Sequence, residues 1–259
     1  MRSFYWALAA ATCLAWPAQA DTTKLKMATI APSLGQAITM STFANVVSSN
    51  LDDVEVEVSG GGAATLHMME TAKGNLDMSM TSPVIYNLMS AGKAMYAKSP
   101  DAPELAKNYR LLMWFPYGQY HFAVRADSDI QTLDDIEGAS VFLGPVGGGA
   151  FNAAKGWVEA TTGLAANDDY EAIKANWATG YQAFLDGTVD VYVNGCLDPC
   201  GQFIQFTETE KLRFIGPESS DGEHVDKWLG KYRYREDIGP GLYDGQANEG
   251  AVTSFSTAV

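Results

Sequence analysis

Basic residues are scarce in this 259-residue chain, which contains 17 lysines and arginines against 31 aspartates and glutamates. The formal net charge at pH 7 is −14. A surface of this sign repels the phosphates of nucleic acid and of anionic lipid headgroups. We therefore exclude nucleic acid and membrane surfaces as the main binding partners.

Cysteine and histidine are also rare, with three of each. Cys13 lies near the N-terminus, which leaves Cys196 and Cys200, four residues apart. In an exported protein such a pair can form a local disulfide, because a helical segment would place the Cα atoms about 6 Å apart. Two free thiols or half of a metal site are the alternatives. No histidine is close to the pair in sequence, so we predict no metal site.

The familiar catalytic and nucleotide-binding motifs are missing as well. The sequence has no G-x-S-x-G and no H-E-x-x-H. The loop Gly147–Gly149 lacks the Lys-Ser/Thr of a P-loop, and Asn152 stands where a dinucleotide fingerprint needs its third glycine. Backbone amides at a helix start still attract anions. We predict an anion-binding loop, with a simple tight turn as the alternative, and neither enzyme activity nor a cofactor.

Long apolar runs are confined to the N-terminus. Residues 1–20 contain one basic residue, Arg2, then an apolar stretch and a small-x-small end at Ala18–Ala20. This is typical of a cleaved secretory signal peptide, and an N-terminal membrane anchor is the alternative. No later segment approaches 18 uninterrupted apolar residues. We expect cleavage near Ala20 and no direct insertion into a membrane.

One series of elements occurs twice along the chain. Each series reads strand, helix, strand, helix, strand, with the predicted strands at 25–30, 54–59 and 75–82 and again at 139–145, 170–176 and 188–195. The clearest match is between KGNLDMSMTS and DGTVDVYVNG, where Asp77 and Asp190 hold equivalent places and are predicted to make structural turns. Chance similarity of two strand–helix–strand units is the alternative.

This repeat predicts an α/β protein of two lobes, each an open, mostly parallel sheet flanked by helices. We expect lobe 1 to comprise 21–118 and the returning segment 217–259, and lobe 2 to comprise 119–216. The chain is predicted to cross between lobes within Leu111–Val124. The last residues are predicted to form a strand, and we expect the C-terminal end to be truncated; a naturally short protein is the alternative.

Ligands of such sheets bind where strand ends lead into helices. The predicted loops at these ends carry uncharged hydrogen-bond donors: Ser33, Gln36, Thr81, Ser82, Asn194 and the amides of Gly147, Gly148 and Gly149. Tyr117, Phe151 and Trp177 are placed to pack beside a ligand. Neutral donors around a small carboxylate indicate binding and not catalysis.

Three segments resemble the TAXI-type substrate-binding proteins of TRAP transporters, which have the type II periplasmic binding protein fold. They are ETAKGNLDMSMTSP (70–83), RADSDIQTLDDIEGASVFLGPVGGGA (125–150) and FLDGTVDVYV (184–193). The resemblance covers roughly residues 24–216. It implies ligand contacts at Ser33, Gly35, Gln36, Thr81, Ser82, Gly147, Gly148, Gly149, Phe151 and Asn194. The first loop is poorer in glycine than is usual in that family, and the Cys196/Cys200 pair is not a family feature.

The resemblance implies a periplasmic receptor that binds a small organic acid, such as an amino acid, dicarboxylate or keto acid, between its lobes. It would deliver this acid to the membrane subunits of an ion-driven TRAP-type transporter. The receptor of an ABC importer is the nearest alternative. A redox enzyme that uses Cys196 and Cys200 on a binding-protein fold, or a free-standing sensor domain, are more distant ones.

Overall fold

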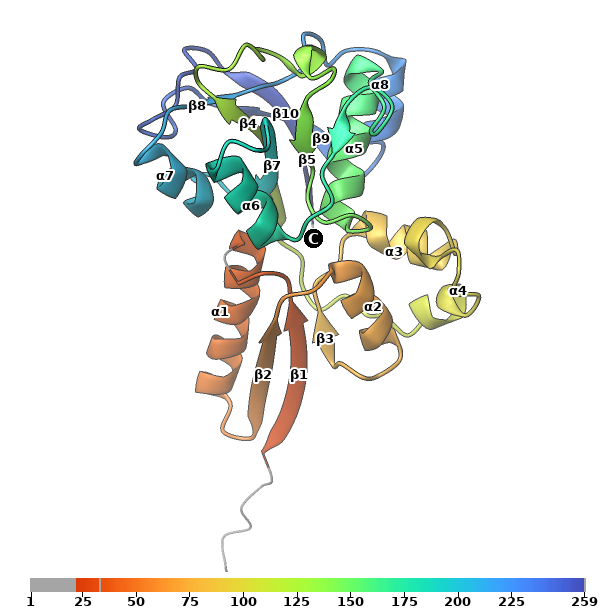
Figure 1. Cartoon of the computed structure of the whole chain (residues 1–259). Coiled ribbons are helices and arrows are strands. Elements are labelled where there is room, and N and C mark those ends of the chain that lie inside the picture. The colour runs from red at the N-terminus through yellow and green to blue at the C-terminus, as the bar shows by residue number, and fades with distance from the viewer. Residues whose placement is uncertain (1–21, 33, 259) are drawn as a thin grey trace, which may run out of the picture.

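The computed structural model describes residues 22–32 and 34–258. The predicted signal peptide and Ser33 lie outside these residues. The chain forms two lobes, a smaller one with a three-stranded sheet and a larger one with a seven-stranded sheet (Figure 1). None of the helices in the described part of the chain is long and apolar enough to cross a membrane.

The smaller lobe is built on a parallel sheet with the strand order β2-β1-β3. Its elements are β1 (Thr23–Thr29), α1 (Gly35–Asn50), β2 (Val54–Gly60), α2 (Ala64–Ala72), β3 (Met78–Ser79), α3 (Pro83–Ser90), η1 (Ala94–Tyr96) and α4 (Ala102–Ala106). Helix α1 buries Ala37, Met40 and Ala44, which share one helical face. It covers the sheet on one side, and α2 lies on the other side (Figure 1).

The larger lobe contains a mixed sheet. Its elements are β4 (Pro116–Arg125), η2 (Leu133–Asp135), β5 (Ser140–Phe142), α5 (Gly149–Thr162), β6 (Glu171–Ala172), α6 (Trp177–Leu185), β7 (Val191–Cys196), α7 (Gly201–Thr207), β8 (Leu212–Phe214), α8 (Glu223–Leu229), β9 (Arg233–Ile238) and β10 (Val252–Ala258). Strand β5 is parallel to β6 and β7. Strand β4 is antiparallel to β7, β8 and β10, and β9 is antiparallel to β10. The α/β class is thus confirmed, but this lobe is less parallel than expected.

The repeat predicted from the sequence is present in both topology and hydrogen bonding. The order β2-β1-β3 of the small lobe recurs as β6-β5-β7 in the large one. The Asp77 carboxylate accepts a hydrogen bond from the Lys26 backbone N–H at 2.7 Å, and the Asp190 carboxylate accepts one from the Ser140 N–H at 2.8 Å. Both aspartates therefore hold the start of their third strand against the first strand. Their role is structural, as expected, but it lies in strand pairing and not in a turn.

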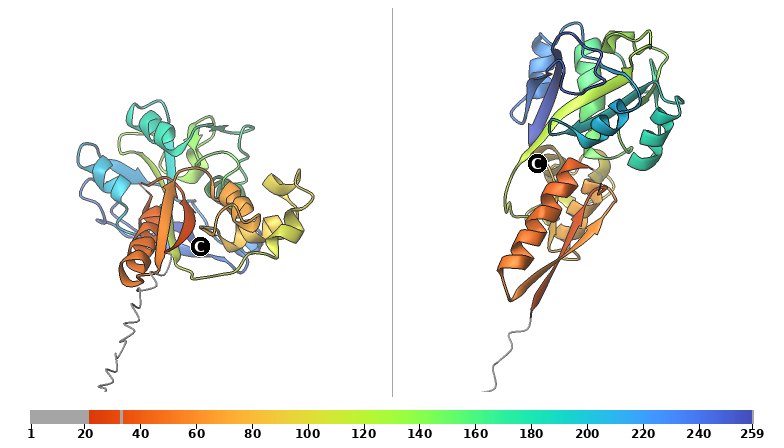
Figure 2. Two further views of the ribbon diagram at one scale, coloured as in Figure 1. Left: turned by 90° about the horizontal axis from the view of Figure 1, so that it is seen from below. Right: turned by 90° about the vertical axis from the view of Figure 1, so that its left-hand side faces the viewer.

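The returning segment differs from its expected place. Residues 217–258 do not pack on the small lobe, because β9 and β10 extend the sheet of the large lobe beside β4 (Figure 2). The physical reason is an aromatic cluster. Phe255 of β10 is completely buried, with its ring centroid 4.2 Å from that of Tyr120 and 4.9 Å from that of Trp228. The large lobe thus begins at β4 and continues to the end of the described chain.

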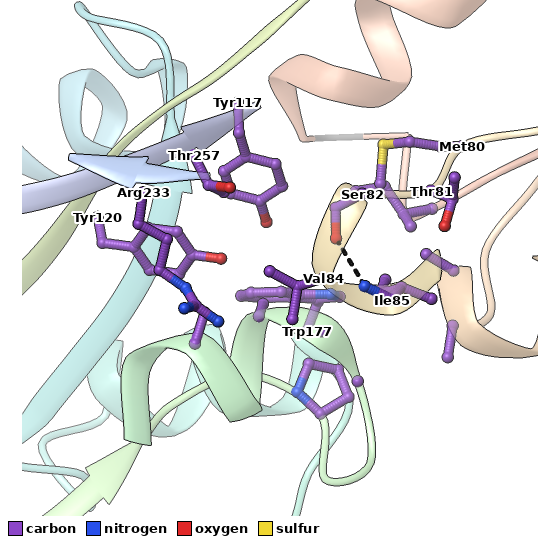
Figure 3. Close-up of a pocket in the computed structure, with 18 residues that line it drawn as sticks. Met80, Thr81, Ser82, Val84, Ile85, Tyr117, Tyr120, Trp177, Arg233 and Thr257 are labelled. Atoms are coloured by element: carbon purple, nitrogen blue, oxygen red, sulfur yellow. Dashed lines mark hydrogen bonds between the residues drawn. The ribbon is translucent and has the colours of Figure 1, made fainter. Parts of the chain in front are cut away.

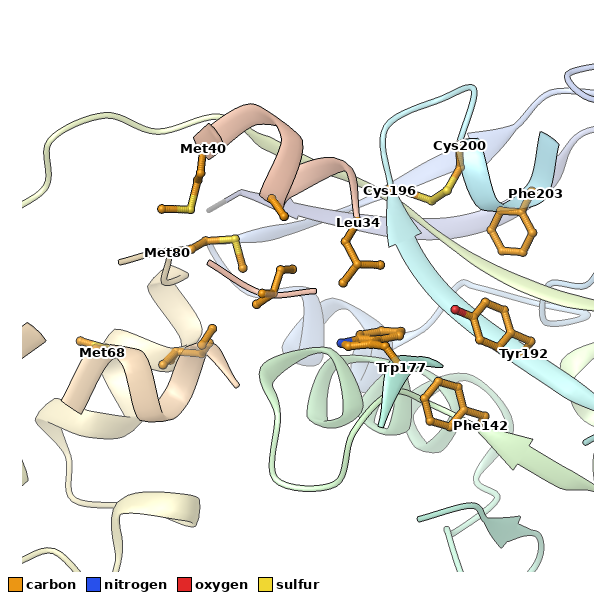
Figure 4. Packing of buried hydrophobic residues seen from close by; sticks show 14 of the residues in the cluster. Leu34, Met40, Met68, Met80, Phe142, Trp177, Tyr192, Cys196, Cys200 and Phe203 are labelled. Atoms are coloured by element: carbon orange, nitrogen blue, oxygen red, sulfur yellow. A yellow bond between two sulfur atoms is a disulfide. The ribbon is translucent and has the colours of Figure 1, made fainter. Parts of the chain in front are cut away.

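The two lobes share one apolar core. Leu34, Met40, Met68 and Met80 of the small lobe belong to the same cluster of buried side chains as Trp177, Phe142 and Tyr192 of the large lobe (Figure 4). A second cluster, which includes Trp157 and Phe255, lies within the large lobe. The shared cluster holds the lobes in contact along the edge where the predicted binding loops lie.

Candidate functional site

A pocket lies between the two lobes and is lined by both (Figure 3). The small lobe contributes Ile30, Ala63, Ala64, Met80, Thr81, Ser82, Val84 and Ile85. The large lobe contributes Tyr117, Tyr120, Pro145, Gly148, Gly149, Ala150, Ala153, Trp177, Arg233 and Thr257. The enclosed volume is about 60 Å³. This space holds a few water molecules.

Two helices begin at this pocket. Ser82 follows β3 and caps α3, because its hydroxyl accepts a hydrogen bond from the Ile85 N–H at 3.3 Å. Gly148 is the N-cap of α5 and offers no side chain to the first turn. The first N–H groups of a helix have no partner within the helix and carry partial positive charge. The pocket is therefore lined by two helix N-termini, one from each lobe, of which α5 offers uncapped N–H groups, whereas in α3 Pro83 has no N–H and the Ile85 N–H is bonded to Ser82.

The glycine-rich loop allows the lobes to approach closely. A β-carbon on Gly149 would lie 2.8 Å from Cδ1 of Ile85, which belongs to α3 of the other lobe. A side chain at this position would require the end of the Ile85 side chain to move. Gly148 and Gly149 line the pocket, whereas Gly147 does not. The loop thus combines bare amides with close contact between the lobes.

Arg233 of β9 is a lining residue that the sequence patterns did not indicate. Its Nη1 donates a hydrogen bond to the Trp228 carbonyl at 2.6 Å, and its guanidinium carbon lies 4.3 Å from the centroid of the Trp228 ring. Its Nε is buried without a hydrogen-bond partner, and within the described chain no carboxylate lies within 4.0 Å of the guanidinium. Burial lowers the pKa of Arg233 because a desolvated cation is unfavourable. A bound anion would relieve this cost.

Two tyrosines stand beside this arginine as neutral hydrogen-bonding groups. The rings of Tyr117 and Tyr120 stack with centroids 5.3 Å apart, and their hydroxyls point toward the middle of the pocket (Figure 3). Burial raises the pKa of Tyr117 to about 12 and raises that of Tyr120 well above its ordinary value. Both phenols therefore stay protonated at neutral pH and add no negative charge to the pocket.

Not all of the predicted binding residues reach this pocket. Thr81, Ser82, Gly148 and Gly149 line it, whereas Gly35, Gln36, Gly147, Phe151 and Asn194 do not. The Asn194 amide is buried and donates to Oε1 of Gln202 at 2.7 Å. Trp177 does line the pocket, but as the first residue of α6 and not in a loop.

Gln36 connects the two lobes. It is buried at the start of α1, and its Nε2 donates to the backbone carbonyls of Tyr117 at 2.8 Å and Gly195 at 2.9 Å. These carbonyls belong to β4 and β7 of the large lobe. Both amide protons are therefore committed to the protein.

Substituting Gln36 with methionine is expected to lower the free energy of unfolding by about 1–3 kcal/mol, because two carbonyls lose their buried donor. Urea denaturation would measure the change. The matched control is Gln182→Met, on the exposed face of α6, where we expect a change within about 0.5 kcal/mol. Equal stability of the two variants would show that the inter-lobe hydrogen bonds contribute nothing to the free energy of unfolding.

Cys196 and Cys200 are joined by a disulfide, with their Cα atoms 5.7 Å apart. The segment is not helical, since Cys196 ends β7 and Cys200 is the N-cap of α7. Both cysteines are buried and neither lines the pocket. This burial gives no support to a redox enzyme, because exchange requires access to a sulfur atom. The described residues also contain no group of three or more side chains suited to a metal ion.

Solved structures of low sequence identity share the fold. The alkanesulfonate-binding protein SsuA from Xanthomonas axonopodis pv. citri, bound to MOPS, is 15% identical with a TM-score of 0.50, and covers 92% of this chain and 66% of its own. DctP7, a Bordetella pertussis extracytoplasmic solute receptor binding pyroglutamic acid, is 12% identical with a TM-score of 0.50. The match covers 92% of this chain and 70% of DctP7. The aliphatic sulphonate binding protein SsuA from Escherichia coli is 14% identical with a TM-score of 0.48. The match covers 90% of this chain and 61% of that protein. This chain thus spans 61–70% of their lengths.

None of the curated proteins matches the sequence. The two structures with a TM-score of 0.50 are an alkanesulfonate-binding protein and a solute receptor. A family model matches residues 33–255, which is most of the chain. The protein therefore belongs to the NMT1-like family.

Proposed function

We propose that this protein is an extracytoplasmic receptor that binds one small organic anion between its lobes and delivers it to membrane transport subunits. The observation that supports this most strongly is the pocket itself. It joins an arginine that has no carboxylate within 4.0 Å among the described residues to the N-termini of α3 and α5. These features attract a negative charge, and the pocket holds no nucleophile paired with a base that would act on it.

Binding requires the lobes to separate first. The volume of about 60 Å³ is far below the roughly 300 Å³ of small ligand pockets. In the described chain, a single covalent connection crosses between the lobes, the segment 109–115 without regular secondary structure that leads into β4. A hinge in this segment would open the pocket without breaking either sheet.

The transporter partner is proposed to be of the TRAP type, as the resemblance to TAXI-type proteins suggests. An ABC importer is the second candidate, because the fold is shared with alkanesulfonate-binding proteins. Uptake by reconstituted membrane subunits would separate the two, since an ion gradient drives the first and ATP drives the second. We also propose a periplasmic location, which the N-terminal residue of the exported protein would test.

A thermal-shift screen of carboxylates, sulfonates and amino acids tests the receptor function. A ligand at 100 times its Kd should stabilise the fold by about 2.7 kcal/mol. This corresponds to a rise in Tm of roughly 5–10 °C for a chain of this size. A screen in which neutral solutes raise the Tm and no anion does would contradict the proposal.

A further inference from the structure

The pocket contains one charge and no compensating one. Arg233 is the only lining residue that is ionised at neutral pH, and the described lining includes no aspartate, glutamate, lysine or histidine. The other polar side-chain groups are the hydroxyls of Thr81, Ser82, Tyr117, Tyr120 and Thr257 and the indole N–H of Trp177. The site therefore offers a partner for one negative charge and for no second ionised group.

A single lining cation favours some classes of organic acid over others. The ammonium of an α-amino acid would be enclosed without a carboxylate to pair with. The second carboxylate of a diacid would be enclosed without a second cation. A charge that loses water and gains no partner is strongly unfavourable. Two of the acid classes expected from the sequence are thus disfavoured by the pocket.

The remaining lining suits an apolar body. Met80, Val84 and Ile85 face the pocket from the small lobe, and Trp177 lies opposite Ser82 near its centre (Figure 3). Trp177 is only 9% exposed, and its ring is fixed by an edge-on contact with Phe142 at 5.6 Å between centroids. A rigid indole and aliphatic side chains gain most from a ring or branched hydrocarbon.

We propose, resting on the receptor function above, that the ligand is a monoanion with an apolar, ring-bearing body. Arg233 binds the oxyanion head, which is a carboxylate or a sulfonate. The amides of α5 lie beside the head, and the protonated phenols of Tyr117 and Tyr120 donate to it. Trp177, Val84 and Ile85 contact the body once the lobes have separated enough to admit it.

Calorimetric titration of the exported chain with one matched series tests this assignment. The parent is 3-phenylpropanoate. Phenylalanine adds only an ammonium, phenylsuccinate adds a second carboxylate, 3-phenylpropanamide removes the charge, and 2-phenylethanesulfonate changes the head. We expect the parent acid or the sulfonate to bind at least about 30-fold more tightly than each of the other three, since an unpaired buried charge or a lost ionic contact has this effect.

Substitutions in β9 test whether Arg233 is responsible for the preference for a monoanion. Arg233→Met should weaken binding of the preferred anion at least about 30-fold and leave the weak binding of the amide unchanged. Arg233→Lys keeps the charge without the planar fork and should give an intermediate loss, which provides a test if the methionine variant does not fold. The matched control is Arg235→Met on the same strand. Arg235 already binds Asp226 at 2.8 Å and does not line the pocket, so binding should change less than threefold.

The results separate the ligand class from the receptor function. Tight binding of phenylalanine or phenylsuccinate would overturn the monoanion assignment and leave the receptor intact. Binding of the amide as tightly as the acid would overturn the role of Arg233. Binding of short acids such as pyruvate without the phenyl series would overturn the apolar body alone. Failure of this series together with the broad thermal-shift screen would overturn both proposals.

Discussion

Gly118→Ala is expected to lower the free energy of unfolding by about 4 kcal/mol, near the upper end of effects for single substitutions. Gly118 has φ +99°, a conformation that side-chain-bearing residues rarely adopt. A β-carbon there would lie 2.1 Å from both the carbonyl carbon and the carbonyl oxygen of Cys196. These are backbone atoms of β7, and the pairing of β4 with β7 and the Cys196–Cys200 disulfide keep them in place. The strand pair must therefore separate.

Urea denaturation followed by tryptophan fluorescence would measure this loss. The control is Gly201→Ala at the first position of α7, where φ is negative and no atom lies within 4 Å of the added carbon. Alanine there should be neutral or slightly stabilising, because it restricts the unfolded chain. Similar stabilities for the two variants would mean that the approach of β4 to β7 is not as close as described.

Phe255→Ala should lower the free energy of unfolding by about 3–5 kcal/mol, the usual range for a large buried aromatic side chain. Phe255 is completely buried, and its ring contacts those of Tyr120, Trp157 and Trp228 at centroid distances of 4.2, 5.3 and 4.9 Å. Tyr120 also lines the pocket, so the cavity left behind would loosen one wall of the binding site. We expect ligand affinity to fall along with stability.

Hydrogen exchange would show where the Phe255 variant opens. Since β10 is part of the large sheet, protection should decrease in β5 and β7 and remain unchanged in β1 and β2. Loss of protection in β1 and β2 would instead support the original expectation that the returning segment packs on the small lobe. Tyr234→Ala on β9 is the control, because Tyr234 is 47% exposed and its loss should change stability by less than about 0.5 kcal/mol.

Four pocket residues, Thr81, Ser82, Gly148 and Gly149, were predictable because parallel strands bring their carboxyl ends to one edge of a sheet. Arg233 was not, although it carries the charge of the pocket. It lies in YRYRED, an alternation of aromatic and charged residues that is typical of an exposed edge strand. Nothing in that pattern shows which lobe the strand joins, and Arg233 faces the pocket only because β9 extends the large sheet.

Local signals were enough for the order of elements within the internal repeat and for the structural character of Asp77 and Asp190. Periodicity and turn residues act over a few positions, and the repeated hydrogen bonds follow from the repeated sequence. The tertiary structure decided the rest. It committed the Gln36 amide to two backbone carbonyls across the lobes, and it placed β10 against β4 through the aromatic cluster around Phe255. Such contacts depend on which surfaces bury the most apolar area together, a property of the whole molecule that no short segment encodes.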